Sequence, residues 1–115
     1  MTGQLLLEKI IGMALLSDFY GPLLTEKQRQ ALSLFYDEDY SLSEIAAECA
    51  CTRQAAHELI KRSEALLADY EQKLGLVAKH QQRQSQLRQV ERELIKLGVE
   101  KTHVLWQRLE EMINN

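Results

Sequence analysis

Apolar residues recur along this chain at intervals of three and four, which is the spacing of one face of an α-helix. The first such segment, residues 4–20, ends at Gly21-Pro22, where glycine can adopt a left-handed cap and proline cannot continue a helix. Its apolar residues cover more than one face, so we expect a helix that packs against two neighbours. They are Leu5, Leu6, Leu7, Ile10, Ile11, Met13, Leu15, Leu16 and Phe19.

Three more helices are predicted before residue 75, each preceded by a residue that favours a helix N-cap. Thr25 precedes the segment 26–38, Ser41 or Ser43 begins a short third helix, and Thr52 begins a helix that runs to about Leu74. Gly75 either caps this helix or lies as a weak point in a longer one. The predicted inward positions are Leu32, Phe35, Tyr36, Leu42, Ile45, Ala46, Cys49, Ala56, Leu59, Ile60, Ser63, Leu67 and Tyr70.

The C-terminal part begins with a polar stretch, residues 78–86, that we expect to be solvated. A helix then follows from the three-and-four spacing of Leu87, Val90, Leu94 and Leu97, and Gly98 ends it. A last helix, 102–113, presents Leu105, Leu109, Met112 and Ile113, with Trp106 alongside. These apolar rows are typical of two antiparallel helices that pack on each other, and equally of the seam of a homodimer.

Composition favours an all-α protein, because the 115 residues include one Pro and many strong helix formers. We expect a single domain, 1–115, with a core at 25–74 and a helical extension at 75–115. The net charge of −3 provides no global positive field for nucleic acid. Residues 25–74 carry −4 and residues 75–115 carry +2, so any binding to phosphate depends on a local patch.

The stretch "YSLSEIAAECACTRQAAHELIKR", residues 40–62, predicts a helix-turn-helix, two short helices joined by a tight turn. Ala46 suits the helix crossing and Thr52 the N-cap of the second helix, whereas Ala50 stands at the left-handed turn position where glycine is usual. In a major groove the second helix would present Arg53, Gln54, His57, Glu58 and Lys61, with Arg62 near a phosphate. Arg53 suits guanine and Gln54 suits adenine, so these six residues are the candidate binding site.

No catalytic, cofactor or metal site is predicted. His57, His80 and His103 fall in separate segments, and a second Glu-x-x-His to match Glu100 and His103 is missing. Cys49 and Cys51 are too few for a zinc site and are interpreted as packing residues, which favours the cytoplasm. The apolar run at residues 4–20 is interrupted by charges and is shorter than a membrane span, so no membrane insertion is expected.

Residues 24–74, "LTEKQRQALSLFYDEDYSLSEIAAECACTRQAAHELIKRSEALLADYEQKL", resemble the DNA-binding region four of bacterial sigma factors. More narrowly, residues 19–48 and 53–74 are similar to the YlxM family of small proteins associated with the signal recognition particle. The resemblance implies a regulatory part in co-translational export, because genes of that family lie beside the gene for the particle's targeting GTPase. The implied partners are this GTPase or the particle's RNA.

Three functions remain open at this point. The first is a non-enzymatic adaptor or regulator of the signal recognition particle, and the second is a dimeric transcription regulator that binds DNA. The third is a scaffold that contacts protein alone, which the acidic balance of residues 25–74 favours. The wide apolar surface of residues 4–20 and the row from Leu87 to Leu97 also predict a homodimer.

Overall fold

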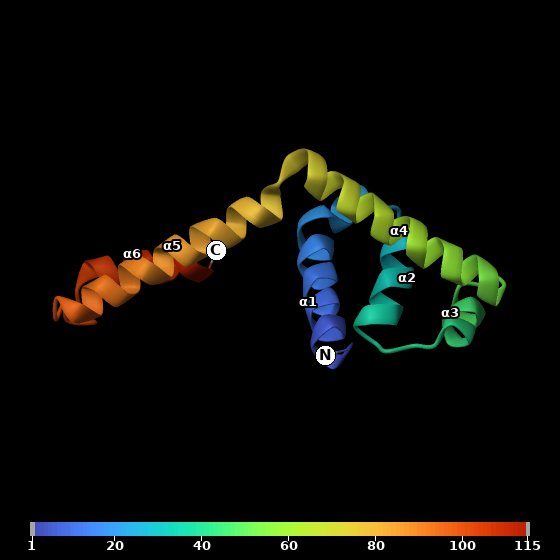
Figure 1. Ribbon diagram of the computed structural model, residues 1–115, viewed down its shortest axis with the longest axis horizontal. Helices are drawn as coiled ribbons and strands as arrows, with labels where there is room; N and C mark the ends of the chain where they lie inside the picture. Colours follow the sequence, from blue (N-terminus) through green and yellow to red (C-terminus); the bar gives the residue numbers. More distant parts are fainter. Residues whose placement is uncertain (1, 115) are drawn as a thin grey trace. The chain divides into compact units, whose positions relative to one another are not determined.

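The computed structural model describes the backbone of residues 2–114 and the side chains of residues 9–114. Over this range the chain forms α-helices and one turn of 3-10 helix, η1, with no β-strand (Figure 1). The all-α prediction is therefore confirmed. The elements are α1 Thr2–Tyr20, η1 Gly21–Leu23, α2 Glu26–Tyr36, α3 Leu42–Glu48, α4 Arg53–Leu74, α5 Leu76–Lys96 and α6 Val104–Asn114.

The chain divides into two compact units, Met1–Val77 and Ala78–Asn115. The prediction that residues 1–115 act as a single domain stays a prediction.

Helix α4 is the centre of the first unit, because it contacts α1, α2 and α3. Seven predicted inward positions are buried there, and the remaining ones are half-buried against the same core. The buried core consists of Tyr20, Leu24, Ala31, Leu32, Ile45, Ala46, Ala56, Ile60, Leu67 and Val77. Buried Ser63 lies on the same side of α4, where its hydroxyl donates to the carbonyl of Leu59 at 2.7 Å.

Helix α1 packs against both α2 and α4, as its wide apolar surface predicts. Met13, Leu15, Leu16 and Phe19 are half-buried against the core. Ile10 and Ile11 are exposed. The predicted apolar positions Leu5, Leu6 and Leu7 lie outside the residues whose side chains are described.

The predicted left-handed cap at Gly21 is wrong. Gly75 and Gly98 are the described glycines with positive φ, whereas Gly21 is buried at the start of η1. The chain continues from α1 into this turn because Pro22, with its fixed φ, fits an early helical position. The Leu24 N–H then donates to the Gly21 carbonyl at 2.9 Å, which closes the turn.

Local side-chain caps begin three of the helices. Thr25 forms a reciprocal capping box with Gln28, and Ser41, rather than Ser43, forms one with Glu44. The hydrogen bonds to Ser41 lower the pKa of the Glu44 carboxyl. The Thr52 hydroxyl accepts from the Ala55 N–H at 3.0 Å, as predicted.

The junction between α4 and α5 combines a left-handed glycine with a buried tyrosine. Gly75 has φ 64° and caps α4, and α5 begins at the next residue. The Tyr20 hydroxyl donates to Glu71 Oε1 at 2.5 Å and accepts from the Leu76 N–H at 3.0 Å. Glu71 Oε1 also accepts from the Val77 N–H, so two side chains cap the first turn of α5. Burial raises the pKa of Tyr20, and its bond to Glu71 raises it further.

The second unit is a helical hairpin in which α6 folds back along α5 (Figure 1). Gln84 Nε2 donates to the Ile113 carbonyl at 2.9 Å, and Trp106 Nε1 donates to the Val99 carbonyl at 3.0 Å. His103 Nδ1 accepts from the Leu105 N–H and so caps α6. The chain thus has the antiparallel pair of helices that was one of the two alternatives.

The inward face of α6 differs from the prediction. Trp106 and Leu109 are buried and Ile113 is half-buried, but Leu105 and Met112 are exposed. The large indole centres the buried side on Trp106, and residues three and seven positions later share that side. On α5, Leu87 and Leu94 are half-buried, whereas Val90 and the adjacent Leu97 are exposed.

Candidate nucleic-acid interface

The turn of the helix-turn-helix is closed by a Schellman motif at the end of α3. The Cys51 N–H donates to the Ala46 carbonyl at 2.9 Å, and the Ala50 N–H donates to the Ala47 carbonyl at 3.4 Å. This pattern requires a left-handed residue, and Ala50 has φ 54°. The predicted left-handed turn at Ala50 is therefore present, and it fixes the direction in which α4 leaves.

Both cysteines lie in this turn. They are half-buried, and neither forms a disulfide. Burial raises the pKa of the Cys49 thiol, and neighbouring Cys51 raises it further. A raised pKa keeps this thiol protonated and weakly nucleophilic at neutral pH. Their environment agrees with a packing role.

The six predicted site residues lie on the first three turns of α4 and are all exposed. We call them the α4 rim: Arg53, Gln54, His57, Glu58, Lys61 and Arg62. Buried Ala56 and Ile60 hold the opposite side of these turns against the core. The helix-turn-helix therefore has a solvent-facing edge of polar and charged side chains.

A surface hollow brings three rim residues together beside α3. Arg53, Gln54 and His57 line it with Leu42, the first residue of α3. A guanidinium, an amide and an imidazole thus converge on one opening. These are groups that donate and accept hydrogen bonds at base edges.

A second hollow, of about 270 Å³, joins the other side of the rim to the start of α2. Glu58 and Arg62 of α4 line it together with Lys27 and Gln28 of α2, and with Cys51. The sequence interpretation missed Lys27. No local signal identifies it, because Lys27 lies in the first turn of α2, outside the helix-turn-helix, and reaches this hollow through the packing of α2 against α4. Two basic side chains, Lys27 and Arg62, thus line the same hollow.

Lys61 differs from the rest of the rim because it has a buried partner. Its Nζ lies 3.6 Å from Glu64 Oε1, while Lys9 Nζ lies 3.6 Å from Glu64 Oε2. The Tyr36 hydroxyl also donates to Glu64 Oε2, at 2.5 Å. The sequence interpretation missed this buried carboxylate, although Glu64 follows Ile60 at helical spacing on the inward side.

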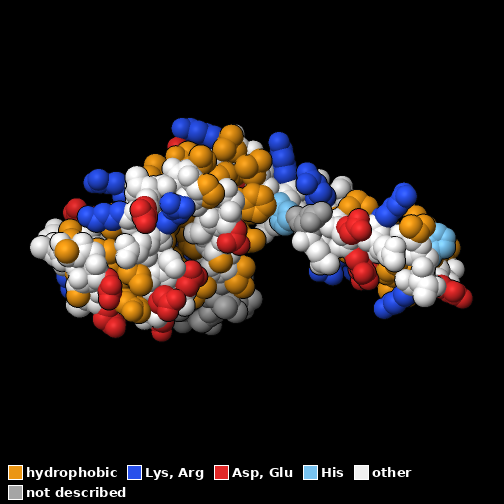
Figure 2. Space-filling view, turned by 180° about the vertical axis from the view of Figure 1, so that it is seen from behind, with side chains coloured by type: hydrophobic (Ala, Val, Ile, Leu, Met, Phe, Trp, Pro, Cys, Tyr) orange, Lys and Arg blue, Asp and Glu red, His pale blue; other side chains and the backbone are white. Residues whose placement is uncertain are grey.

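The charge around the rim is mixed. The first unit, residues 1–77, contains seven Lys and Arg against twelve Asp and Glu, a balance of −5. Figure 2 shows basic side chains interspersed with acidic ones on the face in view, rather than a continuous basic surface. Any attraction to phosphate would therefore have to come from the local group of Arg53, Lys61, Arg62 and Lys27.

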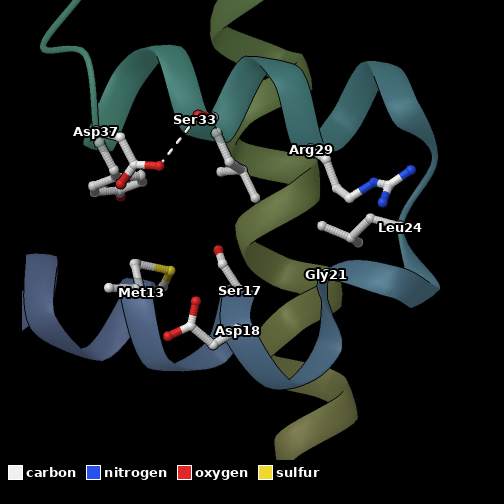
Figure 3. Close-up of a pocket in the computed structure, with 11 residues that line it drawn as sticks. Met13, Ser17, Asp18, Gly21, Leu24, Arg29, Ser33 and Asp37 are labelled. Carbon is white, nitrogen blue, oxygen red and sulfur yellow. Dashed lines mark hydrogen bonds between the residues drawn. The ribbon is translucent and has the colours of Figure 1, made fainter.

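A third hollow, of about 200 Å³, lies between α1 and α2 (Figure 3). Met13, Ser17 and Asp18 of α1 face Ser33 and Asp37 of α2 across it. The Ser33 hydroxyl donates to Asp37 Oδ2 at 3.1 Å, so part of the polar lining is already paired. None of the rim residues lines this hollow.

Among the described residues, no group of three or more His, Cys, Asp or Glu could hold a metal ion. Over the same range, none of the helices combines the length and apolar character that crossing a bilayer requires.

Comparison with known proteins identifies the family. A family model described as "Putative helix-turn-helix protein, YlxM / p13 like" matches residues 7–110. The chain belongs to this family, UPF0122. The predicted membership of the YlxM family and the helix-turn-helix fold are thereby confirmed.

Individual UPF0122 proteins are similar over most of the chain. A UPF0122 protein of Symbiobacterium thermophilum is 61% identical over 71 residues, which cover 62% of this chain and 66% of the relative. A UPF0122 protein of Anoxybacillus flavithermus is 58% identical over 78 residues, which cover 68% of this chain and 71% of the relative. A UPF0122 protein of Halalkalibacterium halodurans is 51% identical over 85 residues, which cover 74% of this chain and 78% of the relative.

Proposed function

We propose that this UPF0122 protein is a non-enzymatic regulatory protein that contacts nucleic acid through the α4 rim. The observation that carries the proposal is the exposure of all six rim residues on a helix whose opposite side is fixed in the core. The helix-turn-helix description of the family supports the same function. Exposed side chains on a helix that is fixed in this way can contact a macromolecule.

The two hollows suit different contacts, one with the bases and the other with the phosphate backbone. Arg53 and Gln54 lie together in the first hollow, where a forked guanidinium and an amide can contact base edges. Arg62 and Lys27 lie in the second hollow, where they can contact the backbone phosphates. Bases and backbone would thus be contacted from adjacent parts of one surface.

The proposed target is the signal recognition particle, and specifically its RNA. This follows from the resemblance to the YlxM family together with the exposed rim. A regulator of this kind would act in the cytoplasm, where the particle meets the ribosome. Duplex DNA is the alternative target, and it would make the protein a transcription regulator.

Fluorescence anisotropy tests the proposal with labelled particle RNA, and in parallel with duplex DNA from the protein's own operon. We expect the full chain to bind one of them, and Arg53→Ala to weaken binding by about 1–3 kcal/mol. Arg62→Ala should weaken binding to every sequence and reduce the slope of log affinity against log salt by about one. Preference for the RNA would support the role in targeting.

Lys73→Ala is the matched control, because Lys73 lies at the far end of α4 and pairs with Asp69 at 3.0 Å. It should leave the affinity unchanged. The proposal is contradicted if neither nucleic acid binds at low salt, or if Lys73→Ala weakens binding as much as Arg62→Ala does.

A second candidate function, contact with a protein alone, is favoured by the acidic balance of the first unit and by Glu58 within the rim. The particle's GTPase is the proposed partner. Glu58→Lys should then weaken co-elution with the GTPase, and a compensating charge reversal on the partner should restore it. Co-elution should be restored only when both charge reversals are combined. Co-elution that is as strong with either single change as with both would argue against this contact.

A further inference from the structure

The helical hairpin of the second unit leaves more large apolar side chains exposed than it buries. Trp106 and Leu109 are its buried side chains among residues 78–114, at 5% and 3% exposure. Six large apolar residues remain open to solvent: Val90 at 48%, Ile95 at 57%, Leu97 at 77%, Val104 at 50%, Leu105 at 45% and Met112 at 52%. Units of fewer than about 40 residues usually need oligomerisation, metals or disulfides to be stable. This unit therefore needs a partner surface.

Four of these six residues, Val90, Leu97, Leu105 and Met112, lie on one face of the hairpin, whereas Ile95 and Val104 lie on other sides of their helices. Consecutive helical residues are turned by about 100°, and Val90, Leu105 and Met112 each directly precede an inward residue. Leu97 lies seven positions after Val90 and so shares its edge. The helices α5 and α6 are antiparallel and face each other. A residue one position before an inward residue therefore points to the same side of the hairpin on both helices. We call Val90, Leu97, Leu105 and Met112 the hairpin face.

We propose that the hairpin face binds the hairpin face of a second copy of this chain, with α5 of each copy packed on α6 of the other. A two-fold axis parallel to the helices gives this arrangement and closes a four-helix bundle. The seven-residue spacing of the apolar pair on each helix is the spacing of bundle seams. The homodimer predicted from the sequence thereby acquires a defined surface.

Charge complementarity selects a second copy as the occupant. Glu93 lies three residues after Val90 and four before Leu97, on the outer side of the α5 edge. Arg108 lies three residues after Leu105 and four before Met112, on the outer side of the α6 edge. In the bundle, Glu93 of each copy therefore faces Arg108 of the other. Glu93 contacts Lys96 at 3.6 Å within one chain. Both side chains are exposed, so this ion pair is weak and can be exchanged for one with Arg108 of the other copy.

Sedimentation equilibrium of the full chain, without nucleic acid, tests the proposal separately from the proposed function. We expect a dimer that Glu93→Arg or Arg108→Glu weakens about tenfold, because each variant sets like charges opposite each other. The combination of both changes should restore the dimer to within about threefold of the unmodified chain. Leu97→Asp should also weaken it about tenfold, and its high exposure leaves the fold of each hairpin intact.

Glu110→Arg is the matched control, since Glu110 follows Leu109 and lies on the opposite side of α6. It should leave the dimer unchanged, and circular dichroism should show the same helix content in every variant. A chain that is monomeric at high micromolar concentration overturns the proposal. So does a dimer that the two charge reversals leave unaffected, or one that their combination fails to restore.

Discussion

Ala50 is the residue at which the turn of the helix-turn-helix is most strained, because its φ of 54° places a Cβ in the left-handed region. Ala50→Gly removes the clash at a site whose two Schellman hydrogen bonds remain. We expect the free energy of unfolding to rise by about 0.5–1 kcal/mol, measured by urea denaturation. Ala47→Gly, inside α3, is the control and should lower it by a similar amount. Destabilisation by both would contradict the argument.

Tyr36 shows how a buried carboxylate couples stability to pH. Its hydroxyl donates to Glu64, which also lies near Lys9 and Lys61. Tyr36→Phe leaves Glu64 with one partner fewer and should cost about 1–3 kcal/mol near neutral pH. Tyr40→Phe removes a hydroxyl outside this network and should cost little. Urea denaturation of the three proteins measures the difference.

The pH dependence of the Tyr36 effect has a definite sign. Burial, and then the bond to Glu64, raise the pKa of Tyr36 above its ordinary value of 10.0. The folded state then holds the phenolic proton more tightly than the unfolded state, so this contribution is full below pH 10 and is lost as the pH rises further. The stability gap between the unmodified chain and Tyr36→Phe should narrow above pH 10. A constant gap from pH 8 to pH 11 would contradict the assignment.

At the scale of elements, two glycines make opposite predictions for one substitution. Gly12 lies inside α1 with open space around its Cβ position, so Gly12→Ala should stabilise the protein by up to about 1 kcal/mol. Gly75 has φ 64° between α4 and α5, so Gly75→Ala should destabilise it by about 1 kcal/mol. Thermal or urea unfolding of both variants measures the signs. Equal signs would show that Gly75 needs no left-handed conformation.

The features that sequence predicted well are those fixed by neighbouring residues. Thr25 and Thr52 cap their helices, and Ala50 adopts the left-handed turn, because a cap or a turn involves residues within a few positions. Gly21 was misassigned because the following Pro22 can also begin a 3-10 turn. Leu105 and Met112 were misassigned because a short helix with apolar residues on several sides does not reveal which side faces a neighbour.

The sequence predicted which residues of the candidate site are exposed, but not which of them lie beside residues of other helices. Exposure of Arg53 and Gln54 follows from the helical spacing of the buried residues on α4. The position of Lys27 beside Arg62, and the contact of Lys61 with Glu64, depend on how helices distant in sequence pack together. Such contacts carry no local signal, so they require the three-dimensional structure.

At the scale of the whole molecule, the two units carry net charges of opposite sign. The first unit carries −5 and a local basic rim, whereas the second, residues 78–115, has seven basic and five acidic residues, a balance of +2. A dimer built from the hairpins would present two α4 rims to one target. Avidity of this kind raises affinity without new contacts, which offsets the weak attraction expected from an acidic first unit.

The single tryptophan, Trp106, reports on the hairpin alone because it is buried there and donates to the Val99 carbonyl in the loop before α6. Its fluorescence should change at a lower urea concentration than the main loss of helix, since the hairpin buries so few side chains. If the hairpin pairs with a second copy, the fluorescence midpoint should rise with protein concentration, by about 1.4 kcal/mol of dimer stability for each tenfold increase. The later loss of helix from the first unit should stay at the same urea concentration. A fluorescence midpoint independent of concentration would place the stability of the hairpin within one chain, and so would contradict the pairing.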